Sequence, residues 1–105
     1  MLAMFDNKSM LIGEKLLSTG TSNAALISAK DIYRTALQYQ AAYVVVLHNH
    51  PSGNPEPSRE DILVTRKIKA CGELLDILLM DHIIIGDNRY FSFREQDILF
   101  EKGRD

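Results

Sequence analysis

A buried strand that runs directly into a histidine-bearing loop constrains this chain more than any other feature. Residues 41–47 form an apolar run rich in valine, which is typical of a strand buried on both faces. His48 and His50 follow it, and a loop interrupted by three prolines comes next. Ser58 and Asp61 then stand where a helix should begin. Strand ends that deliver side chains into open loops commonly form sites, so we expect a functional site here.

The residue types in this stretch are those that hold a divalent metal. In an extended segment residues i and i+2 point to the same side, so His48 and His50 can converge while Asn49 turns away. Asp61, in the first turn of the next helix, can supply a third, anionic ligand. Two imidazoles and one carboxylate suit Zn²⁺, although Fe²⁺ uses the same set. The spacing therefore predicts a zinc site whose open fourth position would hold a reactive water.

The same residues also have a purely structural interpretation. Ser58 to Asp61 form a capping box by themselves, and the helix dipole favours an acidic residue in a first turn. Proline-rich loops are common, and a His-x-His pair occurs by chance. Spacing alone does not decide between a metal site and a capped helix.

The hydrophobic pattern predicts an α/β domain with a mixed sheet and helices packed against it. Ser28 should cap the first helix, and Gly72 should end the second. Arg66, Lys67 and Lys69 should lie on the solvated face of that second helix. The expected elements are a hairpin at 1–5 and 10–17, a loop at 21–27, a helix at 29–40, a strand at 42–47, a helix at 59–73, strand-like segments at 74–79 and 82–85, a turn at 86–89, a strand at 90–93 and a short helix at 94–101.

Length, charge and cysteine usage narrow the classes of function. A chain of 105 residues is one domain, 1–105, with a single core. The formal net charge of −2 disfavours nucleic-acid binding by this domain alone. Cys71 is the only cysteine, so we expect no disulfide framework and a cytoplasmic location. No signal peptide or apolar run of about 20 residues is present, so we expect no membrane association.

A resemblance to a known family favours the metal site over the plain capped helix. The full stretch, HNHPSGNPEPSRED, is similar to the RadC family within the JAMM (MPN+) metalloprotease group. Segments at 18–21, 81–86 and 92–95 also resemble RadC segments in matching order, so the resemblance covers nearly the whole chain. It matches the JAMM signature in His48-x-His50-Pro51, in the seven residues from Pro51 to Pro57, and in Ser58-x-x-Asp61.

The resemblance implies a zinc-dependent hydrolase of cytidine-deaminase-like α/β/α fold that cleaves peptide or isopeptide bonds in a peptide or protein substrate. His48, His50 and Asp61 would take the metal-ligand positions. Ser58 would stabilise the oxyanion of the tetrahedral intermediate, as a hydroxyl at a helix N-terminus can do. RadC proteins carry a DNA-repair label, but the family pattern does not establish what they cleave.

The general base of JAMM enzymes is the feature that this chain does not match. Those enzymes carry a glutamate early on the first strand, which takes the proton from the metal-bound water. In RadC-like chains that strand leads to a turn resembling residues 2–6. We therefore expect the glutamate to lie a few residues before Met1. We also expect the first strand to lack its start. Glu14 is the only glutamate in the first 55 residues. It could serve as the base if the sheet curls, although a solvated strand position is more common.

The sequence is compatible with two other classes of function. The domain could be a non-catalytic binding module, since an open edge beside a short first strand could pair with a partner or a second copy to form a homodimer. The DNA-repair label of the family suggests nucleic-acid processing, but the net negative charge of the chain disfavours it. His82 and Cys71 are expected to be structural, with His82 and Asp81 supporting the metal ligands at most.

Overall fold

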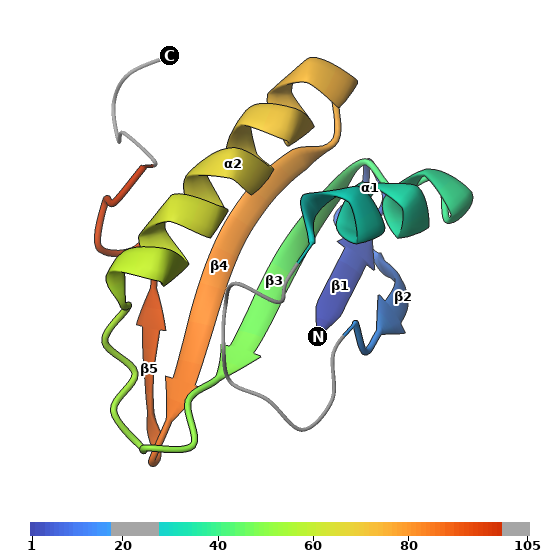
Figure 1. Ribbon diagram of the computed structural model, residues 1–105. Helices are drawn as coiled ribbons and strands as arrows, with labels where there is room; N and C mark the ends of the chain where they lie inside the picture. Colours follow the sequence, from blue (N-terminus) through green and yellow to red (C-terminus); the bar gives the residue numbers. More distant parts are fainter. Residues whose placement is uncertain (18–27, 100–105) are drawn as a thin grey trace.

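Five strands form one mixed sheet in the order β2-β1-β3-β4-β5 (Figure 1). The computed structural model describes residues 1–17 and 28–99, so the expected loop at 21–27 and the similar segment at 18–21 lie outside the described residues. The elements are β1 (Leu2–Phe5), β2 (Leu11–Lys15), α1 (Ala29–Gln38), β3 (Tyr43–Asn49), α2 (Arg59–Leu75), β4 (Leu78–Gly86) and β5 (Arg89–Ser92).

The central strands β3 and β4 are parallel, and α2 makes the crossover between them. The outer strands β2 and β5 each return as antiparallel hairpins, and β1 pairs antiparallel with both β2 and β3. This arrangement places the carboxyl end of β3, and with it His48, near the middle of one edge of the sheet. Ligand sites of α/β sheets commonly lie beyond the carboxyl ends of such strands.

Both described helices cover the same face of the sheet (Figure 1). The core lies between these two layers, because alternate residues of each strand point toward the helices. The mixed α/β class is confirmed. Within the described residues, 1–17 and 28–99, both helices lie on this one face of the sheet. Neither helix has the length and apolar character needed to span a membrane. The most deeply buried apolar residues are Leu2, Met4, Ile32, Ala36, Val44, Val46, Ile68, Ile84 and Phe93.

The end of α2 differs from the prediction. Gly72 does not end the helix, which continues to Leu75 and ends where Asp76 takes a left-handed conformation (φ 57°, ψ 33°). A Cβ at Gly72 would collide with the carbonyl oxygen of Ile77 and with the hydroxyl of Tyr33. The glycine is therefore a close-packing position, and residues 74–75, predicted as strand, are helical.

The strand that follows is also longer than predicted. β4 is one continuous strand, whereas two segments separated at Met80 and Asp81 were expected. The interruption is a local irregularity of pairing, since Val44 lies opposite Leu79 and Val45 opposite Asp81. The predicted hairpins of β1 with β2 and of β4 with β5 are confirmed. Residues 94–97 form turns and residues 98–99 a bend, so the helix predicted from residue 94 is wrong within the described part of the chain.

Candidate metal centre

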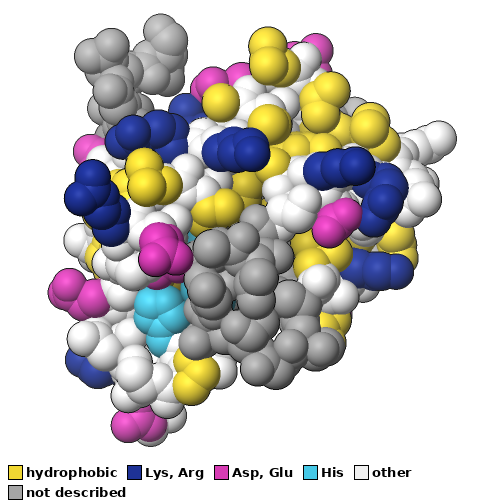
Figure 2. Space-filling view, viewed as in Figure 1, with side chains coloured by type: hydrophobic (Ala, Val, Ile, Leu, Met, Phe, Trp, Pro, Cys, Tyr) yellow, Lys and Arg dark blue, Asp and Glu magenta, His cyan; other side chains and the backbone are white. Residues whose placement is uncertain are grey.

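The predicted ligands come together at the end of β3 and the start of α2. Val44, Val46 and His48 point toward the helices in succession, with exposed fractions of 0%, 2% and 7%, so the two-residue period of the strand delivers His48 into the core. His50 follows the strand, and its N–H donates to the carbonyl of Ile85 at 2.9 Å. Asp61 lies in the first turn of α2 and is 1% exposed. Histidine atoms reach the surface on this face (Figure 2).

The spacing of these side chains fits a metal ion. Oδ1 of Asp61 lies 3.3 Å from Nδ1 of His48, and Oδ2 lies 3.2 Å from Nε2 of His50. One ligand atom from each of the three residues lies within 4.8 Å of the others. Ligands at the usual Zn–N and Zn–O distances in a tetrahedron are ~3.3 Å apart. The two carboxylate–imidazole distances are close to this edge length, each made by a different oxygen of Asp61, so the three residues could hold a metal ion.

The hydrogen bond on the far side of His50 supports a cation at the centre. Nδ1 of His50 lies 2.9 Å from the carbonyl oxygen of Asn54, and because a carbonyl only accepts, Nδ1 carries the proton. In the neutral ring, Nε2 then has a lone pair directed at the carboxylate of Asp61. Two such lone pairs repel unless a proton or a metal ion lies between them. Metal-binding histidines are commonly oriented in this way.

Asp61 is held as an anion. Burial by itself raises the pKa of its carboxyl, but hydrogen bonds from His48 and from the backbone and hydroxyl of Ser58 outweigh burial and lower the pKa to about 2. Its Oδ2 accepts from the N–H of Ser58 at 2.7 Å. Its Oδ1 faces Nδ1 of His48 at 3.3 Å, and both atoms are buried. A buried carboxylate that stays ionised beside an imidazole nitrogen is suited to sharing a metal ion with it.

Ser58 forms the predicted capping box with Asp61, so the structural interpretation of this stretch is also confirmed. The Oγ of Ser58 accepts from the N–H of Asp61 at 3.1 Å. The cap uses the hydroxyl oxygen as an acceptor, and the same hydroxyl also forms a hydrogen bond that lowers the pKa of Asp61. Capping and metal binding are thus compatible, because the box is what aims the carboxylate at the two histidines.

Glu14 is not brought to this cluster. It lies opposite Ala3 on β1, which lies opposite Val45 on β3, and paired residues share a face of the sheet. His48 is three residues beyond Val45 and therefore points to the other face. Glu14 is exposed on the edge strand β2. The sequence alone could not exclude it, because the side on which a hairpin presents a residue depends on register.

Thr65 and His82 lie behind the ligands, and Thr65 was not singled out by sequence reasoning. Both side chains are 0% exposed. Burial is the main reason that the pKa of His82 falls to about 4, and the nearby His48 lowers it further. Asp81 accepts from the backbone N–H of His82 at 2.8 Å, so it supports the backbone of His82. Thr65 follows Asp61 by one helical turn, and this i+4 spacing is the signal that could have revealed it.

The loop between the ligands is anchored on the turn after β4. Gly53 adopts φ +87°, which favours glycine. Its N–H donates to the carbonyl of His50 at 3.0 Å, and its own carbonyl accepts from the N–H of Asp87 at 2.8 Å. A Cβ at Gly86 would collide with that carbonyl. The loop therefore closes onto β4 and holds His50 in place.

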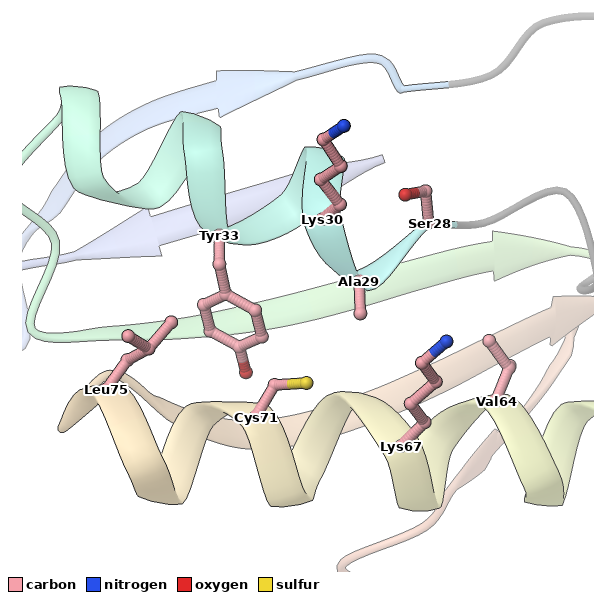
Figure 3. A pocket seen from close by; sticks show the side chains of 8 residues that line it. All are labelled: Ser28, Ala29, Lys30, Tyr33, Val64, Lys67, Cys71 and Leu75. Carbon is pink, nitrogen blue, oxygen red and sulfur yellow. The ribbon is translucent and has the colours of Figure 1, made fainter.

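A separate groove of about 560 Å³ lies between α1 and α2 (Figure 3). Lys30 and Lys67 project from the two helices beside it, and Cys71 points from α2 toward α1. Cys71 is half-buried against the core, as expected for a small apolar side chain. The three metal-ligand candidates do not line this groove, so it is distinct from the metal centre. Its lining residues are Ser28, Ala29, Lys30, Tyr33, Val64, Lys67, Cys71 and Leu75.

The structure is a mixed α/β domain with a His-His-Asp cluster that could hold a metal ion at the end of a central strand. The family model of the RadC-like JAB domain matches residues 1–98, and the chain belongs to this family. A UPF0758 protein of Thermotoga maritima is 50% identical over 91 residues, which is 87% of this chain and 41% of the relative. One from Clostridium perfringens is 45% identical over 98 residues, 93% of this chain and 43% of the relative.

A third relative, a UPF0758 protein of Methanosarcina mazei, is 45% identical over 91 residues, which is 87% of this chain and 40% of the relative. The chain thus spans about two-fifths of the length of these curated relatives. The predicted resemblance to RadC proteins is confirmed.

Proposed function

We propose that this domain is a zinc-dependent hydrolase that cleaves peptide or isopeptide bonds. The observation that carries the proposal is the approach of the Asp61 carboxylate to one nitrogen of each histidine, at 3.3 Å from His48 and 3.2 Å from His50. The formal net charge of −2 supports a peptide substrate over a nucleic acid. The free thiol of Cys71 is consistent with a reducing cytoplasm.

Four residues of the chain would bind the metal and stabilise the transition state. His48, His50 and Asp61 would hold the metal, which when bound supplies a Lewis acid and lowers the pKa of a water at its open position. Ser58, at the N-terminus of α2, would donate its hydroxyl hydrogen to the oxygen that gains charge as the substrate carbonyl is attacked. The partial positive charge of the helix N-terminus acts in the same direction.

The register of β1 indicates where a general base could be supplied. The amino group of Met1 donates to the carbonyl of Leu47 at 2.7 Å, and Leu2 lies opposite Val46. Continuing this antiparallel register upstream would place the residue before Met1 opposite His48, and the third residue before Met1 opposite His50. Both would share the face of His48. A glutamate at the third position would therefore lie beside the ligands.

Elemental analysis of protein purified without chelators or a histidine tag tests the proposal. We expect near-stoichiometric zinc in the wild type and its loss in Asp61→Asn and His48→Ala. Glu60→Gln is the matched control, because Glu60 is an exposed carboxylate in the same turn of α2 and should leave the zinc content unchanged. A folded wild-type protein that takes up no metal even after zinc is added would overturn the proposal.

A second candidate function is that of a non-catalytic module that pairs with a second copy. The face of the sheet opposite the helices carries exposed apolar side chains, including Leu78 at 50%, Ile85 at 40% and Tyr90 at 58%. Exposed apolar surface of this kind is typical of interfaces. Sedimentation analysis distinguishes the two: a dimer abolished by Ile85→Lys would support the module, and a monomer at high concentration would argue against it.

A further inference from the structure

Two polar side chains lie buried directly behind the ligand cluster, where the neighbouring positions are aliphatic. Thr65 on α2 and His82 on β4 are each 0% exposed, and the residues flanking them toward the core include Val46 and Ile84. Burying an imidazole and a hydroxyl is costly unless they are hydrogen-bonded to each other or to a partner. Apolar residues at both positions would avoid this cost, so the pair calls for an explanation.

The hydrogen bonds of Thr65 determine the state of His82. Oγ1 of Thr65 lies 2.6 Å from the carbonyl oxygen of Asp61 and 2.5 Å from Nδ1 of His82. A hydroxyl has one hydrogen, and the carbonyl can only accept it. Thr65 therefore donates to Asp61, and Nδ1 of His82 donates to Thr65. The chain of bonds runs from β4 through α2 to the main chain of a metal-ligand candidate.

His82 also contacts the first histidine through its ring. Its centroid lies 5.9 Å from that of His48 with an interplanar angle of 23°, and 5.0 Å from that of Phe93 with an angle of 4°. His48 in turn meets His50 edge to face, with centroids 4.8 Å apart. The ring of His82 thus lies between a fully buried phenylalanine and a ligand candidate. In a close-packed core, a ring in this place is positioned to restrict the rotation of His48.

We propose that Thr65 and His82 are positioning residues for the metal centre. Thr65 fixes the main chain of Asp61 in the first turn of α2, and His82 fixes the ring of His48 at the end of β3. The pair joins the two elements that carry the ligands. The effect on metal affinity rests on the proposed function, whereas the placement of His48 can be measured without a metal.

Thr65→Val is the informative variant, because it removes the hydroxyl while nearly keeping the shape of the side chain. Thr65→Ser restores the hydroxyl and should rescue the effect. Thr35→Val is the matched control, since Thr35 is also buried in a helix, at 6% exposure, but lies on α1 away from the cluster. The first measurement is the NMR spectrum of the imidazole nitrogens and ring protons in metal-free protein. The second is the absorption spectrum and affinity of bound Co²⁺, by competition with a chelator.

We expect Thr65→Val to shift the ring resonances of both His82 and His48 and to weaken Co²⁺ binding by ~10–100-fold with an altered spectrum. Thr65→Ser and Thr35→Val should match the wild type in both measurements. A folded Thr65→Val protein with unchanged His48 resonances would overturn the proposal, as would unchanged Co²⁺ affinity and spectrum in a wild type that binds the metal.

The outcomes separate this proposal from the proposed function. A wild type that binds neither Zn²⁺ nor Co²⁺ refutes the metal centre, and the His48 resonances then decide the positioning role alone. Where Thr65→Val does not fold, His82→Asn carries the test, because its amide nitrogen can take the place of Nδ1 in donating to Thr65 but presents no ring to His48. Unchanged His48 resonances in His82→Asn would refute the proposal.

Discussion

The Oδ2 atom of Asp61 lies 2.7 Å from the N–H of Ser58 and accepts a hydrogen bond from it. The same oxygen lies 3.2 Å from Nε2 of His50, so one carboxylate both caps a helix and completes the ligand cluster. The cap restricts the rotamer of Asp61, because its carboxylate must remain over the first turn of α2. Four consequences of this arrangement and of the packing around it can be measured.

Ser58→Ala should separate capping from catalysis. Loss of the N-cap side chain lowers the free energy of unfolding by about 1 kcal/mol, while the backbone N–H that orients Asp61 remains, so zinc should still bind. Ser28→Ala is the control, because Ser28 caps α1 in the same way, with Asp31 N 3.2 Å from its Oγ. In protein whose β1 is extended to carry a glutamate three residues before Met1, only Ser58→Ala should lower kcat, by ~100-fold or more. Equal activity of the two variants in that extended protein would remove Ser58 from the mechanism.

An N-terminal extension of β1 should raise peptidase activity. We expect little activity in residues 1–105 alone, since a positioned general base contributes ~10²–10⁴-fold. Lengthening the strand with a glutamate three residues before Met1 should restore it, and a glutamine at that position should not. Cleavage of an isopeptide-linked fluorogenic substrate gives the rates. Identical rates for the two extended proteins, both folded and zinc-loaded, would argue against a base on this strand.

Gly72→Ala should destabilise the domain although alanine favours helices. The added Cβ would collide with the carbonyl oxygen of Ile77 and the hydroxyl of Tyr33, and such overpacking typically costs about 1–3 kcal/mol. Ala70→Gly, at an exposed position of the same helix, should cost about 1 kcal/mol through propensity alone. Urea unfolding measures both. A stabilised Gly72→Ala protein would mean that α1 and α2 are not packed as described.

The stability of metal-free protein should fall between pH 6.5 and pH 4. Burial lowers the pKa of His82 to about 4 in the folded state from 6.5, so in this window the unfolded chain binds a proton that the folded chain does not. The contribution of neutral, buried His82 to the free energy of unfolding is complete above pH 6.5 and amounts to about 3 kcal/mol. Urea unfolding with a chelator present should show a smaller pH dependence in His82→Phe. An equal pH dependence of the free energy of unfolding in both proteins would mean that a group other than His82 causes it.

The local features of the site were predictable from the sequence. The alternation of β3 places His48 on the buried side, and the Ser58 capping box places Asp61 at the start of α2, as expected. The strand alternation and the helix N-terminus depend on residues within one turn or two strand positions of each other. The resemblance to RadC proteins, first seen in the 48–61 stretch, was confirmed over residues 1–98.

Only the tertiary structure decided how distant elements meet. Register across β1 turned Glu14 away from His48, and packing of α1 against α2 made Gly72 a contact point instead of a helix end. The pairing of Thr65 with His82 likewise joins a helix to a neighbouring strand. These relations depend on which strands pair and which faces pack. Hydrophobic periodicity along the chain specifies the face that each element buries, but it does not specify the partner on that face.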